Sequence, residues 1–398
     1  TIDVTANNIT LTSGFATAQA AAGAGGIGAA NNFLEINADR NGAGGMITAS
    51  DLPTTTTRGI YLDELTGDMR LSLVQSKAAV SLRTVAGSLI DAADDAAADV
   101  WSTTLDIDAN GGSIGTRANT LEVDSLRGIA SSLVTTAATE DVALEATGDI
   151  VLTEIAGMLR LVFAHSFSGD ILLTAAESAA GGEHIVLTRS GAAIFAESNT
   201  RGPNSNTDAP RPIANGTVMA ERGSVTLRAG DHIATDSNSR IVAARGIVME
   251  GDFGNADAGV GTQITLRGQI VAGAVITPRA PNAANPLAAF TPFYGAPQHL
   301  VQVFGNADAD TITFGDAGGI GGGTALGSAG YIFLGAKTVV KAGAGEDQLT
   351  VNYLQDMAAV TSPSMLATLT QQGRQNALHT LTLDGQAGND AYTVQSIG

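Results

Sequence analysis

The chain has 398 residues, of which 39 are acidic and 20 are basic, so its net charge is 20 − 39 = −19, and such an acidic surface repels the phosphates of nucleic acids. It contains no cysteine, which excludes disulfides, thiolate zinc sites and iron–sulfur clusters, and no apolar run approaches the roughly 20 residues that a membrane-spanning helix needs. A hydrophobic share of 44% is too high for a disordered acidic polymer, so we expect a folded chain with no nucleic-acid partner and no membrane insertion.

The first half of the chain contains one long unit twice. Residues 34–37 (Leu-Glu-Ile-Asn) and 121–124 (Leu-Glu-Val-Asp) each follow a Gly-rich turn, at an offset of 87 residues. Residues 59–71 match residues 149–161 at an offset of 90. Self-similarity of this kind is typical of repeat architectures, so we expect stacked structural units.

Within the unit, a glycine and a small or acidic residue precede an alternating apolar run, as in 148–152 (Gly-Asp-Ile-Val-Leu) and 169–173 (Gly-Asp-Ile-Leu-Leu). Alternation with a period of two is typical of β-strands. Each strand is too short to bury its apolar face alone, but coils stacked about 4.8 Å apart would bury a continuous aliphatic core. The pattern therefore predicts an all-β solenoid, with roughly 18 coils at about 22 residues per coil.

Two helices and two loops are expected beside these strands. An Ala-rich stretch over about 91–101 is a weak helix candidate. A second, short helix is expected over 362–373, where a serine can cap the helix and a proline suits its first position. Proline clusters at 203–212 and 278–297 predict long loops that protrude from the rod.

A second repeated string lies in the other half of the chain. Residues 253–258 (Phe-Gly-Asn-Ala-Asp-Ala) recur identically at 304–309, and a strand-like run follows each copy. The predicted organisation is a β-solenoid with 87–90-residue repeats over 1–275, a Pro-rich loop over 276–300, and a continued solenoid with acidic turns over 301–398.

Three acidic turns in the second half have the composition of calcium-binding loops. Residues 306–310 alternate three oxygen-bearing side chains, and 343–349 and 385–392 place glycines before an acid and then a strand. Glycine permits a tight turn, the acid supplies a hard oxygen, and calcium takes about six to eight such oxygens. The predicted calcium ligands are Asn306, Asp308, Asp310, Asp347, Asn389 and Asp390. The alternative is that these are ordinary turns between strands.

An earlier segment fits half of a different calcium loop. Asp106, Asp108 and Asn110, followed by Gly111, match the first half of an EF-hand loop. The twelfth position, which needs a bidentate glutamate, is Arg117, and no pair of helices flanks the segment. We therefore keep the two aspartates and the asparagine as candidate ligands in a calcium loop of another shape, against the alternative of a solvated turn.

No set of residues in the sequence points to an enzyme. The five histidines have no metal-ligand spacing, so we expect each to be an isolated surface or strand residue, and no Gly-x-Ser-x-Gly elbow occurs. The chain contains enough carboxylates that their number alone does not exclude the pair of acids that a glycosidase uses. A β-helix enzyme acting on acidic polysaccharides would need a basic, aromatic-lined groove, for which three lysines and one tryptophan are poor material.

Two resemblances add to this interpretation. The run at 112–124 and the Gly-Asp-Ile-x-Leu repeats after it resemble very large bacterial exoproteins of the filamentous-haemagglutinin-like kind, over about residues 1–275. The three acidic turns resemble degenerate copies of the nonapeptide repeat of calcium-binding RTX proteins, although their acids at 310, 347 and 390 are not in tandem, so loops of stacked coils would have to converge. These resemblances imply a right-handed parallel β-helix, export from a Gram-negative cell, and an adhesive or matrix role.

The preferred hypothesis is a structural subunit or repeat unit of an extracellular fibre, surface layer or biofilm matrix of a Gram-negative bacterium, stabilised by calcium. Its partner would be a further coil, by end-to-end self-association or within a larger polypeptide. The chain begins at Thr1 without a signal-peptide pattern, so we expect a processed product or a piece of something longer. The alternatives are an adhesin whose Pro-rich loops contact a receptor or glycan, and a polysaccharide-degrading β-helix enzyme.

Overall fold

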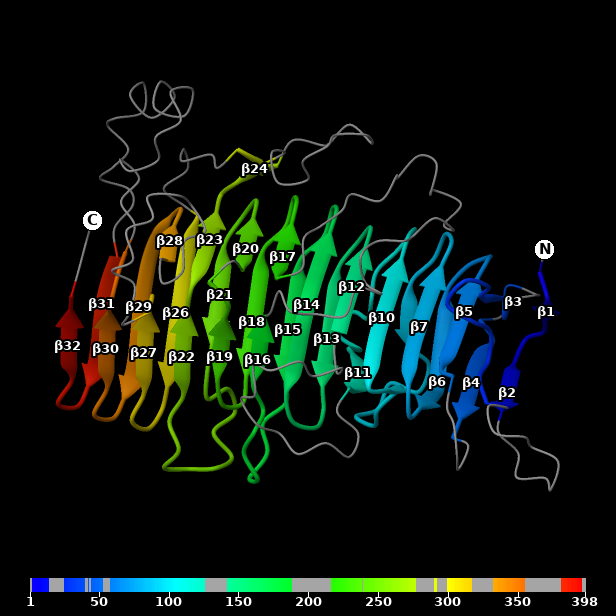
Figure 1. The fold of residues 1–398 in the computed structure, drawn as a ribbon, viewed down its shortest axis with the longest axis horizontal. Helices are drawn as coiled ribbons and strands as arrows, with labels where there is room; N and C mark the ends of the chain where they lie inside the picture. Colours follow the sequence, from blue (N-terminus) through cyan, green and yellow to red (C-terminus); the bar gives the residue numbers. More distant parts are fainter. Residues whose placement is uncertain are drawn as a thin grey trace.

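The structure is a computed structural model of the 398-residue chain. It describes residues 2–13, 25–39, 42, 44–52, 58–125, 142–187, 216–237, 239–276, 290–291, 299–316, 332–354 and 381–395. Figure 1 shows a rod of parallel strands, with β1 at one end and β32 at the other.

Two long sheets build the rod. The 13-stranded sheet contains β2 (Ile9–Ser13), β4 (Met46–Asp51), β6 (Met69–Ser76), β8 (Leu89–Asp91), β9 (Val100–Trp101), β11 (Leu121–Asp124), β13 (Ile150–Glu154), β15 (Ile171–Ala175), β18 (Val225–Ala229), β21 (Ile247–Glu250), β26 (Leu300–Asn306), β29 (Lys337–Ala344) and β31 (Leu381–Ala387). The 17-stranded sheet contains β1 (Val4–Thr5), β3 (Leu34–Asn37), β5 (Ile60–Glu64), β7 (Ala79–Thr84), β10 (Thr104–Ala109), β12 (Val142–Ala146), β14 (Leu159–Ser166), β16 (Ile185–Leu187), β17 (Thr217–Ala220), β19 (Ile233–Thr235), β20 (Arg240–Ala243), β22 (Gln263–Leu266), β23 (Gly268–Ala272), β27 (Thr311–Phe314), β28 (Ile332–Leu334), β30 (Gln348–Val351) and β32 (Ala391–Val394). A separate antiparallel pair joins β24 (Val275–Ile276) and β25 (Phe290–Thr291).

The chain alternates between the two long sheets, and every pairing within them is parallel to the equivalent strand of the next coil. In the first half, β5 pairs with β7, β7 with β10 and β10 with β12. At β14 the 17-stranded sheet divides, because its first part pairs with β16 and its second part with β17. The next four coils each contribute two short strands to that sheet, and the last two described coils contribute one each, β30 and β32. The strand β26 pairs with β21 across the Pro-rich segment, so the stack continues there.

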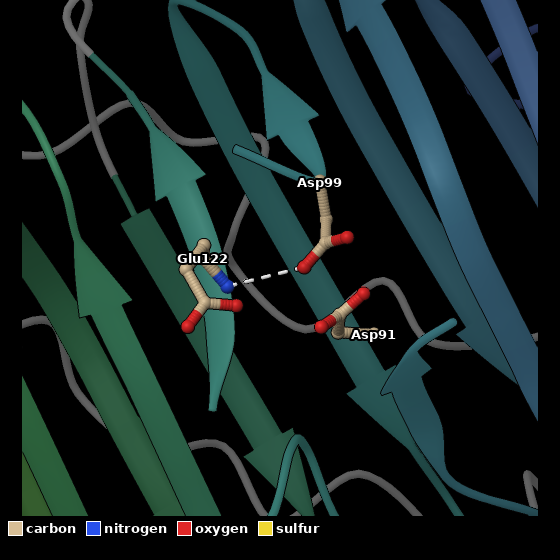
Figure 2. Close-up of side chains that lie close together, drawn as sticks. All are labelled: Asp91, Asp99 and Glu122. Carbon is tan, nitrogen blue, oxygen red and sulfur yellow. Dashed lines mark hydrogen bonds between the residues drawn. The ribbon is translucent and has the colours of Figure 1, made fainter. Parts of the chain in front are cut away.

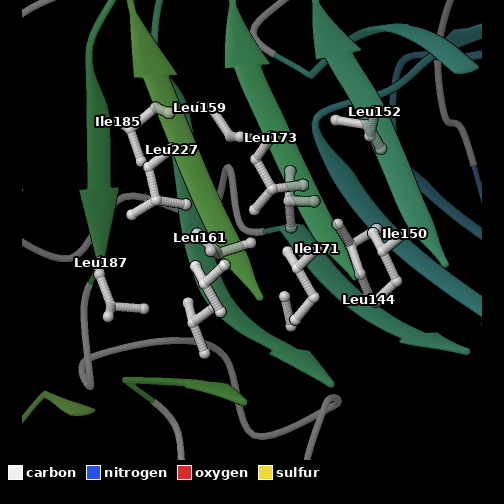
Figure 3. Packing of buried hydrophobic residues seen from close by; sticks show 14 of the residues in the cluster. Leu144, Ile150, Leu152, Leu159, Leu161, Ile171, Leu173, Ile185, Leu187 and Leu227 are labelled. Carbon is white, nitrogen blue, oxygen red and sulfur yellow. The ribbon is translucent and has the colours of Figure 1, made fainter. Parts of the chain in front are cut away.

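The core is a set of aliphatic columns that run along the rod. Register places Ile150, Ile171, Val225, Ile247 and Val301 one above another on five successive coils. All five are buried, and Figure 3 shows neighbouring leucines and isoleucines packed between the sheets. Each fully buried side chain of this type contributes about 1.5–3 kcal/mol. A narrow two-sheet interior filled this way needs few aromatics, which agrees with an aromatic share of 4%.

The repeated Gly-acid theme is explained by a ladder of hydrogen bonds that links successive turns. At five successive turns along the 13-stranded sheet, a side-chain oxygen of the preceding coil accepts a backbone N–H of the next coil. The donor and acceptor pairs are Ser88 to Asp68 (2.8 Å), Ser113 to Ser88 (3.0 Å), Asp149 to Ser113 (2.9 Å), Asp170 to Asp149 (2.7 Å) and Ser224 to Asp170 (2.8 Å). These acids therefore satisfy backbone donors that a strand end leaves unpaired.

The longer sequence repeat relates the two sides of the solenoid. The segments 34–37 and 121–124 form β3 and β11, which lie in different sheets. Likewise β5 and β13, which the offset of 90 aligns, lie in different sheets. The repeated sequence is therefore a strand and turn that can form on either side of the rod, because both sides need an apolar face towards the core and a turn at the corner.

The predicted all-β parallel solenoid is confirmed, but other predictions need correction. The helix over 91–101 is wrong: Asp91 ends β8, and its carboxylate accepts the N–H groups of Ala93 (2.6 Å) and Asp95 (3.2 Å), which favours a tight turn over a helix. The helix over 362–373 and the Pro-rich loops at 203–212 and 278–297 fall outside the described residues, apart from β25.

The number of coils is also smaller than expected. Among the described residues, the path of the 13-stranded sheet leaves out β8 and has twelve rungs, against the roughly 18 predicted, which corresponds to a stack of roughly 55 Å. Among the described residues, no helix is long and apolar enough to cross a membrane, as the sequence predicts.

Candidate metal centre

Three predicted calcium ligands lie in one column along the stack. Asp310, Asp347 and Asp390 directly precede β27, β30 and β32, which pair in register. The backbone N–H of Asp310 donates to Asp347 Oδ1 (2.9 Å), and that of Asp347 donates to Asp390 Oδ1 (3.3 Å). Asp310 Oδ1 accepts the N–H of Thr262 in the same way (2.7 Å). These aspartates thus cap the backbone of the preceding coil.

The same column carries uncompensated charge. Asp310 and Asp347 are each 1% exposed, and their Oδ2 atoms are buried without a hydrogen-bond partner. Burial, followed by the charges of Asp347, Asp252 and Asp308, raises the pKa of Asp310 to about 8. Burial also raises the pKa of Asp347, with Asp390 adding to the effect. The three carboxylates follow one another along the rod and are not among the described groups of three that meet within 4.8 Å.

Two of the other three predicted ligands of this region, Asn306 and Asp308, have backbone partners. Asn306 has a φ of 85° and donates through Nδ2 to the carbonyl of Gly251 (2.8 Å). Asp308 has a φ of 62°, and its Oδ2 accepts the N–H of Gly259 (2.8 Å). Asn389 is exposed in the turn before β32. The structure therefore distributes the predicted ligands over three coils.

The EF-hand-like segment is a strand in place of a loop. Asp106 and Asp108 lie in β10, where Asp106 Oδ2 accepts the hydroxyl of Ser81 (2.7 Å) and Asp108 Oδ2 lies 3.5 Å from Arg83 Nε. Asn110 follows the strand and donates through Nδ2 to the carbonyl of Thr84 (3.1 Å). Each side chain therefore has a partner on β7 or at its end, and an ion pair already compensates Asp108.

A different group of carboxylates meets at one point of the structure. Glu177 follows β15, and Asp252 and Asp257 follow β21. One carboxylate oxygen of each lies within 4.8 Å of the other two. In the 13-stranded sheet, β18 separates β15 from β21, so the loops that carry these acids come from coils two rungs apart. We name this group the Glu177 cluster.

Four of the six carboxylate oxygens of the Glu177 cluster are buried without a hydrogen-bond partner. Both carboxylate oxygens of Glu177, Oδ1 of Asp252 and Oδ1 of Asp257 accept no hydrogen bond, and neither does Oδ1 of the neighbouring Asn255. Asp252 is 2% exposed, and only its Oδ2 accepts a backbone N–H, that of Ala307 (3.2 Å). Burying carboxylate oxygens without hydrogen-bond partners costs free energy, and a positively charged partner at this site would offset that cost.

No basic side chain supplies that partner in the described part of the chain. No arginine or lysine there forms an ion pair with Glu177, Asp252 or Asp257. Burial, followed by the charges of neighbouring acids, raises the pKa of Glu177 to about 7. The same causes raise the pKa of Asp252 to about 6, although the N–H of Ala307 offsets part of the shift. Burial and the negative charges of neighbouring acids therefore disfavour ionisation of Glu177 and Asp252.

Two further acids lie at the edge of this cluster. Asp231 Oδ2 accepts the N–H groups of Gly182 and, at 2.7 Å, Glu183. Burial acts to raise the pKa of Asp231, but these backbone donors and the nearby His184 outweigh it, so the pKa is lowered. Glu183 accepts the hydroxyl of Ser178 through Oε1 (2.6 Å), and its Oε2 is buried without a partner. Asp231 is therefore an ionised acid beside the cluster.

Two histidines also differ from expectation. The prediction of isolated histidines is wrong for His184 and His232, whose rings stack with centroids 4.5 Å apart and an interplanar angle of 5°. His184 Nδ1 lies 3.7 Å from Asp231 Oδ2. Burial and the charge of His232 lower the pKa of His184 to about 4, so His184 is neutral at pH 7 and does not compensate the acids.

The Glu177 cluster suits a hard divalent cation. Its ligand atoms are carboxylate oxygens, which calcium prefers, and Glu177 can bind through two oxygens. Glu177, Asp252 and Asp257 would hold the ion, and water would complete the shell. The sequence contained one signal for this site: residues 253–258 repeat residues 304–309, whose Asn306 and Asp308 are predicted calcium ligands. Nothing in the sequence indicated Glu177.

Comparisons with known proteins add no further assignment. No protein-family model, curated protein or solved structure matches this chain. The filamentous-haemagglutinin-like and RTX-like resemblances therefore remain hypotheses, while the parallel two-sheet solenoid rests on the structure itself.

Proposed function

We propose that this chain is a structural β-solenoid of an extracellular fibre, surface layer or biofilm matrix, stabilised by calcium. The observation that carries the proposal is the Glu177 cluster, where buried carboxylate oxygens from coils two rungs apart meet without a positive partner. A cation there would connect the loops after β15 and β21. In a stack whose coils contact only their neighbours, such a link stabilises the rod over more than one interface.

The setting of the proposal is outside a Gram-negative cell. Free calcium is abundant there, and the absence of cysteine leaves strand stacking and metal ions as the available means of stabilisation. The resemblance to exported bacterial surface proteins agrees with this location. At one end of the described stack, β32 exposes Tyr392 (51%) and Val394 (55%), a surface on which a further coil can stack.

The calcium part of the proposal is tested by thermal unfolding. Calcium should raise the melting temperature of the unmodified chain, since a ligand at 100 times its Kd stabilises by about 2.7 kcal/mol. Glu177→Gln and Asp252→Asn should lose most of this calcium-dependent rise, because each removes a charged ligand. Asp3→Asn, at an exposed aspartate outside every candidate ligand group, should keep it. A melting temperature that calcium and chelator leave unchanged would refute a structural calcium role.

The assembly part is tested separately by electron microscopy at rising protein concentration, with and without calcium. End-to-end filaments of the rod support a fibre or layer. Compact single rods under all of these conditions count against self-assembly, even if calcium stabilises the fold.

A further inference from the structure

A second group of buried carboxylates lies near the other end of the rod. Asp91 ends β8, Asp99 directly precedes β9, and Glu122 lies in β11. Because β9 and β11 pair with Val100 opposite Val123, Asp99 and Glu122 are neighbours across the two strands. Figure 2 shows the carboxylates of Asp91 and Asp99 facing each other, with that of Glu122 beside them. We name this group the Asp99 cluster.

The backbone holds the three carboxylates in fixed positions. Both oxygens of Asp91 accept backbone N–H groups of its own turn, from Ala93 and Asp95. Asp99 Oδ2 accepts the N–H of Glu122 (3.2 Å), and Glu122 Oε1 accepts the hydroxyl of Thr120. One oxygen of each of the three carboxylates lies within 4.8 Å of the other two.

One oxygen of the Asp99 cluster is left without a partner. Glu122 is 8% exposed, and its Oε2 is buried and accepts no hydrogen bond. Asp91 and Asp99 are 2% and 3% exposed. Among the described residues, no arginine or lysine forms an ion pair with any of the three. Burial, and then the charge of Asp91, raises the pKa of Asp99 to about 9, as expected for an acid whose negative charge lacks compensation.

We propose that Asp91, Asp99 and Glu122 bind a hard divalent cation, calcium or magnesium, at a site separate from the Glu177 cluster. All three ligand atoms are carboxylate oxygens, which excludes a preference for soft transition metals. The cation would satisfy Glu122 Oε2 and fix the turn between β8 and β9 against β11. The proposal does not depend on the Glu177 cluster, which lies on later coils.

The only tryptophan of the chain gives this site its own optical signal. Trp101 lies on β9, two residues after Asp99, which directly precedes this strand. In extended backbone, side chains two residues apart point to the same face, roughly 7 Å apart. Terbium(III) is a hard, oxygen-seeking probe that emits when a nearby indole transfers energy to it. Excitation at the red edge of the indole band, where tyrosine does not absorb, therefore reports terbium at the Asp99 cluster.

The experiment titrates the intact chain with terbium and then displaces it with calcium or magnesium, which identifies the preferred ion. We expect saturable tryptophan-sensitised emission. Asp99→Asn and Glu122→Gln should each weaken terbium binding by about tenfold or more, because affinity depends on ligand charge. Asp94→Asn is the matched control: Asp94 is exposed in the same turn, and asparagine tolerates its φ of 54°. Its binding should be unchanged, as should that of Asp252→Asn in the other cluster.

Three results would overturn the proposal. The first is the absence of sensitised emission from the unmodified chain. The second is unchanged emission in folded Asp99→Asn and Glu122→Gln variants, checked by circular dichroism. The third is an equal loss in Asp94→Asn, which would indicate diffuse attraction by surface charge. If one ligand variant fails to fold, the other decides. Loss of calcium stabilisation at the Glu177 cluster alone leaves this site unaffected.

Discussion

Two buried glutamates show how a single side chain secures a corner of the solenoid. Glu64 ends β5, and its carboxylate accepts the N–H groups of Ala38 on the preceding coil (2.9 Å) and of Thr66 in its own turn (3.1 Å). Glu154 ends β13 in the other sheet and accepts the N–H and hydroxyl of Ser125 on the preceding coil. The repeat at offset 90 therefore conserves a backbone-capping carboxylate on both sides of the rod.

These glutamates should make stability depend on pH. Burial, only partly offset by the two N–H groups, raises the pKa of Glu64 to about 7 from 4.5. The folded chain therefore holds a proton that the unfolded chain releases, so this contribution is complete below pH 4.5 and is lost as the pH rises towards 7. We expect Glu64→Gln, which cannot ionise, to reduce the fall in the free energy of unfolding across this window by on the order of 2 kcal/mol, measured by urea denaturation at each pH.

The control for this measurement is Glu346→Gln, at an exposed glutamate, which should keep the pH dependence of the unmodified chain. Parallel pH curves for the two glutamine variants would show that Glu64 is not the titrating group.

At the scale of the element, the turns before the 13-stranded sheet are held together by close approach of the backbone. The acids and serines that cap these turns follow glycines that stack from coil to coil. A Cβ on Gly169 would lie 2.4 Å from the amide nitrogen of Asp149, and one on Gly223 would lie 2.0 Å from the carbonyl oxygen of Gly169. A side chain there would displace the coil above it and lengthen the hydrogen bond from Asp170 to Asp149.

Substitution in this column should therefore be costly. We expect Gly169→Ala to destabilise the chain by about 1–3 kcal/mol, through overpacking against a neighbouring backbone. Gly246→Ala is the matched control in the turn before β21, where an added Cβ would have its nearest contact at 3.5 Å, the carbonyl oxygen of Leu300. Its cost should be below about 1 kcal/mol. Equal denaturation midpoints for the two variants would contradict the role of close stacking.

At the scale of the whole molecule, the solenoid is a linear stack in which each coil is supported by its two neighbours. Central strands are covered on both sides, and every residue of β14 is buried. The last described strand, β32, has only β30 as a partner, and its four residues are exposed. Local stability in such a stack depends on neighbouring interfaces, so it should decrease towards an uncovered end.

Hydrogen exchange should show this gradient directly. We expect amides of β31 and β32 to exchange faster than those of β13 to β15, because the end coil can open without disturbing the rest. Peptide-level mass spectrometry of the exchanged chain measures it. Exchange as slow at β32 as at β14 would show that the stack opens only as a unit, or that another coil covers its end in solution.

The sequence by itself determined the kind of fold, because the features that specify it are local. Alternating apolar residues such as Ile150 and Leu152 define an inward face, and the glycine and acid before them define a turn, so a parallel solenoid follows without knowledge of distant contacts. The same reasoning failed at 91–101, where alanine content predicted a helix but the aspartates formed turns through their own side chains.

Only the tertiary structure decided which acids meet. Glu177 and Asp252 are 75 positions apart, and no period in the sequence relates them, since the length of each coil varies with its loops. In parallel stacked coils, residues at the same register position lie next to each other, and the register of each coil depends on where its loop rejoins the rod. This register places Asp108 beside Arg83, whose positive charge offsets that of the aspartate. It leaves the Glu177 and Asp99 clusters with buried carboxylate oxygens that only a proton or a cation can satisfy.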